Sequence, residues 1–180
     1  SVQAIKSDDA GTTCVPAYTG NQSVNVSFNY VSPNTGTQAL GFSTDDSSYT
    51  PLTAGVASNS TLNFSNANAT AEFYLAYPDA GQLNLTFTDP NGVLVAGSVA
   101  TGNDSFVVRP AELQIKMQDS SGTDLAGGTY MAGRPFNLAI QAVNLDGTIT
   151  PNYQASALEI NPLMLGPSVS SGANKSTFFY

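Results

Sequence analysis

The 180-residue sequence contains no histidine and no tryptophan, and it has a single cysteine, Cys14. Without histidine, neither a Ser-His-Asp triad nor a Cys-His pair can form, and zinc sites built from imidazoles or paired thiolates are excluded as well. Cys14 is expected to be a structural residue, either unpaired or bonded to a cysteine outside these residues. Lys6 is the only cation close to it in sequence, which argues against a thiolate nucleophile.

Charge is also scarce, because charged residues make up 10% of the chain against roughly 25% in an average soluble domain. The 13 acidic and 5 basic residues give a formal net charge of −8. Nucleic acids and anionic membrane surfaces are bound by basic faces, so neither is expected as a partner. No apolar run approaches the roughly 18 residues of a membrane span, and we expect no membrane insertion of this segment.

What the sequence does contain is apolar residues at every second position, the pattern of half-buried β-strands. Val24, Val26, Phe28 and Tyr30 form the clearest run, and further strands are expected at 2–5, 37–42, 62–64, 71–77, 83–87, 93–99 and 106–108. Pro, Gly and Asn between the runs supply the backbone angles that turns require. The predicted fold class is all-β.

A domain boundary is expected at Arg109-Pro110, where proline ends one strand and new alternating runs follow at 113–117 and 136–142. Strands separated by frequent turns favour sandwiches. We therefore predict tandem immunoglobulin-like (Ig-like) antiparallel β-sandwiches over residues 1–109 and 110–180. The second segment is shorter than the roughly 100 residues of such a sandwich. It also stops within the apolar run 177–180, so we expect it to be truncated or completed by a strand from elsewhere, another chain included.

Six segments carry a family resemblance: 1–9 (SVQAIKSDD), 14–18 (CVPAY), 75–83 (LAYPDAGQL), 104–110 (DSFVVRP), 132–136 (AGRPF) and 146–153 (DGTITPNY). Together they resemble the MshQ family, large proteins encoded with the biogenesis genes of mannose-sensitive haemagglutinin (MSHA) type IV pili in Gram-negative bacteria. The resemblance implies a protein outside the cell or on its surface that acts as an adhesive or assembly component. It implies other protein subunits or pilus components as partners, and it carries no catalytic residues.

Some polar residues have expected structural roles. Asp79 and Gly81 are similar to the corner before strand F of Ig-type domains, although Leu83 stands where a tyrosine corner has its Tyr. Asp104 is expected just before the last strand of the first domain, bonding nearby amides as an Asx-turn. Arg109 is expected to tie the two modules together through carboxylate or carbonyl contacts. The alternative for each is a solvated polar side chain at a turn.

No cofactor is required by any of these motifs, and calcium is the only metal ion considered. Asp119 and Asp124 bracket a turn-rich segment whose oxygens suit a hard cation, and a junction using Asp8, Asp9 or Asp104 is a second candidate. The spacing matches no EF-hand loop, so the alternative is that each Asp only forms a turn.

Enzymatic activity is not expected. The densest acidic pairs, Asp8-Asp9 and Asp45-Asp46, are adjacent in sequence, and neighbouring residues on a strand point to opposite faces. A glycosidase instead needs two carboxylates across a cleft.

Two hypotheses remain. The leading one is an extracellular structural or adhesive module of a pilus-associated protein that assembles into filaments by strand exchange. The alternative is a carbohydrate-binding module for surface glycans. Its aromatic candidates are Tyr18, Tyr49 and Tyr130, although packing in the core or at its rim would explain these residues equally well.

Overall fold

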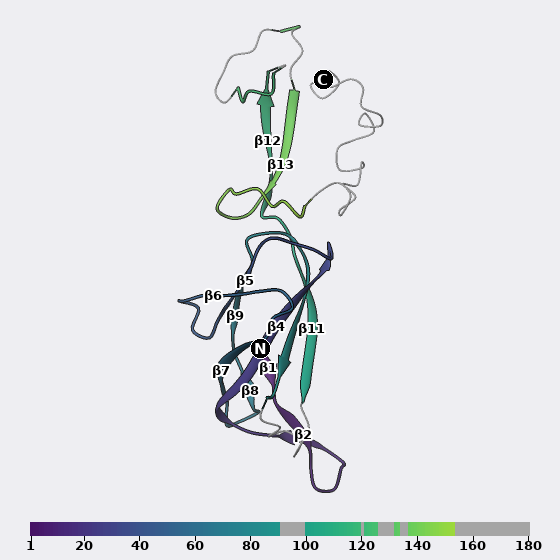
Figure 1. Cartoon of the computed structure of the whole chain (residues 1–180), viewed down its shortest axis with the longest axis vertical. Coiled ribbons are helices and arrows are strands. Elements are labelled where there is room, and N and C mark those ends of the chain that lie inside the picture. The colour runs from purple at the N-terminus through teal and green to yellow at the C-terminus, as the bar shows by residue number, and fades with distance from the viewer. Residues whose placement is uncertain (91–99, 120, 126–131, 134–136, 154–180) are drawn as a thin grey trace. The chain divides into compact units, whose positions relative to one another are not determined.

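The computed structural model of the chain describes residues 1–90, 100–119, 121–125, 132–133 and 137–153. The chain divides into two compact units, Ser1–Val108 and Arg109–Tyr180. Every regular element among the described residues is a β-strand, and the strands pair antiparallel, so the all-β prediction is confirmed (Figure 1). Those residues include no helix with the length and apolarity that crossing a bilayer requires. The strand expected at 93–99 and the run 177–180 lie outside the described residues.

The first unit is built from two main sheets and two short strand pairs. The larger sheet has the order β11-β10-β4-β7, the smaller one has the order β6-β5-β9, and β1 pairs with β8 and β2 with β3. The strands are β1 Val2–Gln3, β2 Ile5–Ser7, β3 Cys14–Pro16, β4 Gly20–Ser32, β5 Leu40–Ser43, β6 Thr50–Leu52, β7 Ser58–Phe64, β8 Thr70–Ala71, β9 Tyr74–Ala76, β10 Gly81–Thr88 and β11 Thr101–Val108.

The core of this unit lies between the two main sheets. On β4 the inward positions Val24, Val26 and Phe28 are 3%, 0% and 0% exposed, as the alternation predicts. From the smaller sheet, Phe42 of β5 reaches across to Phe87 of β10, with ring centroids 6.3 Å apart. The large aromatic side chains therefore fill the space between the layers.

The strand predicted over 71–77 is two strands in the structure, as is the one predicted over 2–5, which is divided between β1 and β2. The alternation over 71–77 is continuous, yet β8 pairs with β1 whereas β9 pairs with β5. Glu72 and Phe73 lie between them, where the chain passes from one sheet to the other. Periodicity records which face a residue occupies but not which strand it pairs with, so the single-strand prediction was wrong here.

A tight corner precedes β10. Asp79 is 2% exposed, and its Oδ1 accepts a hydrogen bond from the Ala80 amide at 2.7 Å. Gly81 has φ +146°, and a Cβ there would lie 2.9 Å from the carbonyl oxygen of Ser32. Only glycine adopts this backbone conformation without strain, so Gly81 permits the close approach of the β10 start to the end of β4.

The expected position of Asp104 was wrong. β11 begins at Thr101, so Asp104 lies within the strand rather than before it. Its Oδ1 still accepts a hydrogen bond from the Ser105 amide at 2.8 Å. In the β10–β11 register Asp104 is opposite the buried Leu85, which places the carboxylate on the core-facing side of an edge strand, where it is exposed.

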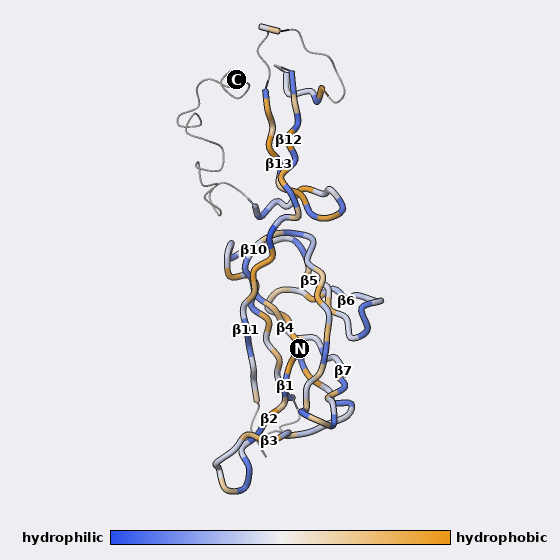
Figure 2. Tube along the Cα trace, turned by 180° about the vertical axis from the view of Figure 1, so that it is seen from behind, coloured by the Kyte–Doolittle hydropathy of each residue, from blue (hydrophilic) through white to orange (hydrophobic). Residues whose placement is uncertain are grey.

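In the second unit the described strands form one hairpin, β12 Glu112–Gln118 and β13 Asn137–Val143. Ile115 is directly opposite Ile140, and the flanking pairs on the same face are Leu113 with Ala142 and Met117 with Leu138. Figure 2 shows the resulting hydrophobic stretches along both strands. That this unit is a second Ig-like sandwich stays a prediction.

Candidate functional site

A polar hollow lies beside the β7 edge of the larger sheet. Its volume is about 740 Å³, and its lining residues are Asn21, Thr44, Thr61, Asn63, Ser65, Asn68, Thr70 and Glu72. Asn21 is opposite Asn63 in the β4–β7 register, at positions that alternate with inward-facing residues such as Leu62. The same alternation that builds the core therefore turns these amide side chains outward.

The amide pair is oriented by a hydrogen bond within the hollow. The side-chain nitrogen Nδ2 of Asn63 donates to Oδ1 of Asn21 at 2.7 Å. No partner among the described residues takes up the amide hydrogens of Asn21 or the side-chain oxygen of Asn63. The pair thus presents donors and an acceptor side by side.

The far wall of the hollow is a tight turn between β7 and β8. Ser65 and Thr70 are joined by a backbone hydrogen bond of 2.9 Å, and the Oδ1 of Asn68 accepts from the Thr70 amide at 3.2 Å. Ala69 has φ +52° and is fully buried. From β1, Gln3 donates its side-chain amide to the Asn68 carbonyl at 2.8 Å, which fixes the turn from outside.

The hollow is almost uncharged. Among the described residues that line it, Glu72 alone is ionisable, and the others carry amides or hydroxyls. Sequence reasoning missed this site because its residues come from separate segments. Each one resembles the solvent-facing residue of an ordinary strand or turn.

A second cavity of about 220 Å³ lies between the N-terminal strands and the larger sheet. Tyr18, Phe64 and Phe87 contribute aromatic rings to its wall, and Asp89 lies at its polar side. Its apolar lining is continuous with the core, since Phe64 is 2% exposed.

The calcium candidates in the second unit are bonded to protein groups. Oδ1 of Asp119 accepts hydrogen bonds from the Ser121 hydroxyl at 2.6 Å, the Ser121 amide at 2.8 Å and the Thr123 amide at 3.0 Å. These bonds lower the pKa of Asp119, the Ser121 hydroxyl most of all. Asp124 lies 3.6 Å from Lys116 Nζ and accepts from Gln118. Asp119 thus forms a turn, and Asp124 forms an ion pair.

Of the first-unit candidates, Asp8 and Asp9 lie in the β2–β3 loop and Asp104 lies on β11. Asp8 accepts a hydrogen bond from the Thr13 hydroxyl at 2.6 Å and from the Thr12 amide at 2.8 Å. The Thr13 bond is the main reason that the pKa of Asp8 falls to about 2. Asp8, Asp9 and Asp104 do not form a three-carboxylate cluster. Among the described residues no three His, Cys, Asp or Glu side chains form a cluster that could hold a metal ion.

Two of the three tyrosines proposed for glycan stacking have other contacts. Tyr18 is half-buried, and its ring meets Phe64 edge-on with centroids 4.9 Å apart. The Tyr49 hydroxyl donates to Asp46, which raises the pKa of Tyr49, and its ring lies against Gly41. Tyr130 lies outside the described residues.

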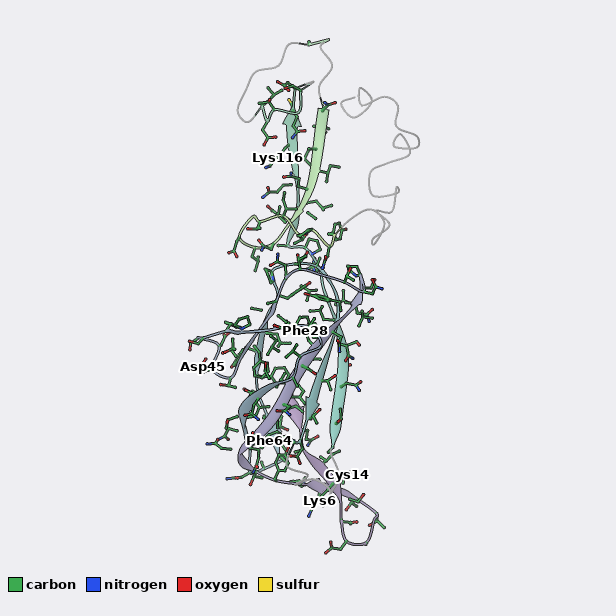
Figure 3. The ribbon with its side chains drawn as sticks, viewed as in Figure 1. Lys6, Cys14, Phe28, Asp45, Phe64 and Lys116 are labelled. Carbon is green, nitrogen blue, oxygen red and sulfur yellow. The ribbon has the colours of Figure 1, made fainter. Side chains whose placement is uncertain are left out.

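Cys14 and Arg109 are not among the residues that line the hollow. Cys14 is an exposed free thiol on β3, and Figure 3 shows it near Lys6 of the paired strand β2. Arg109 is the exposed first residue of the second unit. Its expected contact between the modules stays a prediction.

These features define an Ig-like β-sandwich module with a polar hollow beside the β7 edge of its larger sheet. Residues 1–103 match the family described as "Domain of unknown function (DUF6701), first Ig-like domain", and the chain belongs to this family. Neither the curated proteins nor the solved structures include a match to this chain.

Proposed function

We propose that this chain is a structural and adhesive module of an MshQ-like, pilus-associated protein on the surface of a Gram-negative bacterium. Its function is to hold a shape outside the cell and to present contact surfaces to other subunits. The Ig-like family of residues 1–103 supports the architecture. The resemblance of six sequence segments to the MshQ family supports the pilus association.

One observation supports assembly through the second unit. On one face of the β12–β13 hairpin, Ile115 is 66% exposed, Leu113 is 49% exposed and Ile140 is 43% exposed. A two-stranded hairpin is marginal in water and needs its apolar face covered. A strand donated by another subunit would extend the ladder at one edge of the hairpin, and its apolar side chains would enlarge this face so that it can pack as part of a larger sheet.

Light scattering on the full chain over a range of protein concentrations tests the assembly. We expect the mass to rise with concentration, and the substitution Ile115→Ser should weaken this rise. Gln114→Ser, on the opposite face of the same strand, is the matched control and should leave it unchanged. A strictly monomeric mass at the highest concentration would contradict strand exchange.

Surface location has its own test. An antibody raised against the chain should label intact cells and sheared pilus fractions of the source bacterium. Labelling that appears only after the cells are lysed would contradict a surface role.

A further inference from the structure

We propose that the polar hollow beside β7 binds a neutral glycan, an assignment that rests on the adhesive role proposed above. The hollow combines amide donors, amide acceptors and hydroxyl groups over a volume of about 740 Å³, within the range of about 300–1,000 Å³ for small-molecule sites. A sugar ring presents the same mixture, because every hydroxyl both donates and accepts.

The Asn21–Asn63 pair supplies the specific recognition. Its internal bond leaves the amide hydrogens of Asn21 and the side-chain oxygen of Asn63 directed to a partner that can accept and donate at neighbouring positions. Adjacent hydroxyls on one sugar ring offer this arrangement. A purely apolar ligand would leave both groups unsatisfied, which costs affinity.

The charge of the lining argues against acidic ligands and gives a cation little to bind. None of the described residues lining the hollow is Lys or Arg, so a phosphate, a sulfate or an acidic polysaccharide meets only Glu72 and a chain of net charge −8. A cation would meet a single carboxylate in the lining, that of Glu72. Seven uncharged polar groups and one carboxylate favour a neutral polyhydroxyl ligand, with Glu72 accepting from a sugar hydroxyl.

Hydrogen bonds within the protein hold the turn that forms the wall of the hollow in place before any ligand binds. Asn68 and Thr70 are fixed by the β7–β8 turn, which is itself held by the Gln3 bond from β1. A rigid turn loses little conformational freedom when a ligand binds. Affinity for one short glycan should still be weak, with a Kd on the order of 1 mM, because neutral hydrogen bonds replace those to water. Repeated modules on one surface would raise the avidity.

Amide chemical-shift mapping on the full chain tests this proposal. The probes are neutral tetrasaccharides of glucose, mannose, galactose and N-acetylglucosamine, together with tetragalacturonate and spermidine as charged probes. We expect at least one neutral probe to shift amides at Asn21, Thr61, Asn63, Asn68 and Thr70, with neither charged probe doing so.

Variants make the mapping decisive. The double substitution Asn21→Ala with Asn63→Ala should raise the Kd at least tenfold, and Glu72→Gln should change it less than threefold. Asn103→Ala is the matched control, an exposed asparagine on β11, three strands away, and it should leave the Kd unchanged.

Three outcomes would overturn the glycan site: no shift with any neutral probe at about 10 mM, a Kd that is unchanged in the double variant, or spermidine as the ligand that maps there. None of them affects the surface-labelling or light-scattering results. The glycan site and the structural role can therefore fail separately.

Discussion

The hydroxyl of Tyr30, on β4, donates a hydrogen bond to the backbone carbonyl of Gln38 at 2.5 Å. Between these residues the chain turns through Gly36, where a Cβ would lie 2.6 Å from Cε1 of the Tyr30 ring. Tyr30 therefore anchors the β4–β5 connection in two ways: its ring packs against Gly36, and its hydroxyl bonds to the carbonyl of Gln38. Burial, followed by the nearby Asp79 carboxylate, raises the pKa of Tyr30, so the hydroxyl remains a donor at neutral pH.

Tyr30→Phe should remove this anchor and keep the ring. The Gln38 carbonyl loses its donor in a partly buried site, and we expect the free energy of unfolding to fall by about 0.5–1.5 kcal/mol. Urea denaturation of the full chain measures the change. Tyr18→Phe is the control, because the Tyr18 contact with Phe64 is made by the ring, and its effect should stay within about 0.5 kcal/mol. Equal effects of the two substitutions would show that the Tyr30 hydroxyl has no anchoring role.

Gly81→Ala should destabilise the first unit more than an ordinary strand substitution does. The new Cβ meets the Ser32 carbonyl oxygen at 2.9 Å, and φ of +146° strains any L-residue. We expect a loss of about 1–3 kcal/mol, measured by thermal and urea unfolding. Gly102→Ala on β11 has no atom within 4 Å of the new Cβ and should change stability by less than about 0.5 kcal/mol. If the Gly81→Ala variant is as stable as the Gly102→Ala variant, the corner before β10 does not require glycine at position 81.

Asp8 should titrate well below an ordinary aspartate. Its pKa is lowered from 3.8 to about 2 by the Thr13 hydroxyl and the Thr12 amide. Because the folded pKa lies below the unfolded one, the stabilisation is fully present above pH about 4 and is lost as pH falls through about 2. Carboxyl chemical shifts followed against pH measure this directly. Thr13→Val should move the pKa back toward 3.8, and a wild-type midpoint already near 3.8 would contradict the hydrogen bonds.

Calcium should leave the melting temperature unchanged. Asp119 Oδ1 accepts three protein donors and Asp124 is paired with Lys116, so an ion would have to displace existing bonds. Thermal melts with 5 mM calcium and then with excess chelator test this, since a ligand of the folded state raises the Tm. A reproducible rise in the melting temperature that the chelator reverses would contradict this prediction and support a calcium site. Asp119→Asn should then abolish that rise.

The sequence predicts those parts of the fold in which a strand keeps the same buried face and the same neighbouring strands along its length. Alternation on β4 identifies Val24, Val26 and Phe28 as buried, and the same rule places the second-unit strands within a residue or two of β12 and β13. The alternation rule fails where consecutive residues of one apolar run pair with different strands, as they do between β8 and β9. The rule also misses β3 and β6, because these strands are short and contain Pro16 and Pro51, and proline usually indicates a turn.

The polar hollow could not be predicted in the same way. Asn21 and Asn63 are 42 residues apart in sequence and become neighbours only through the β4–β7 register. Both occupy outward positions, where asparagine is ordinarily solvated. Reasoning from chemistry favoured aromatic candidates instead, and the structure packs Tyr18 on the core and ties Tyr49 to Asp46.

Asp104 gives the outer edge of β11 a further property. A foreign strand adding there would cover a carboxylate that now faces water on the inner side of the sheet, opposite Leu85. Enclosing that negative charge without a partner is costly, and natural sheets use inward-pointing charges of this kind to stop edge-to-edge growth. Asp104 therefore protects the β11 edge against strand addition, which agrees with the proposal that assembly uses the β12–β13 hairpin instead.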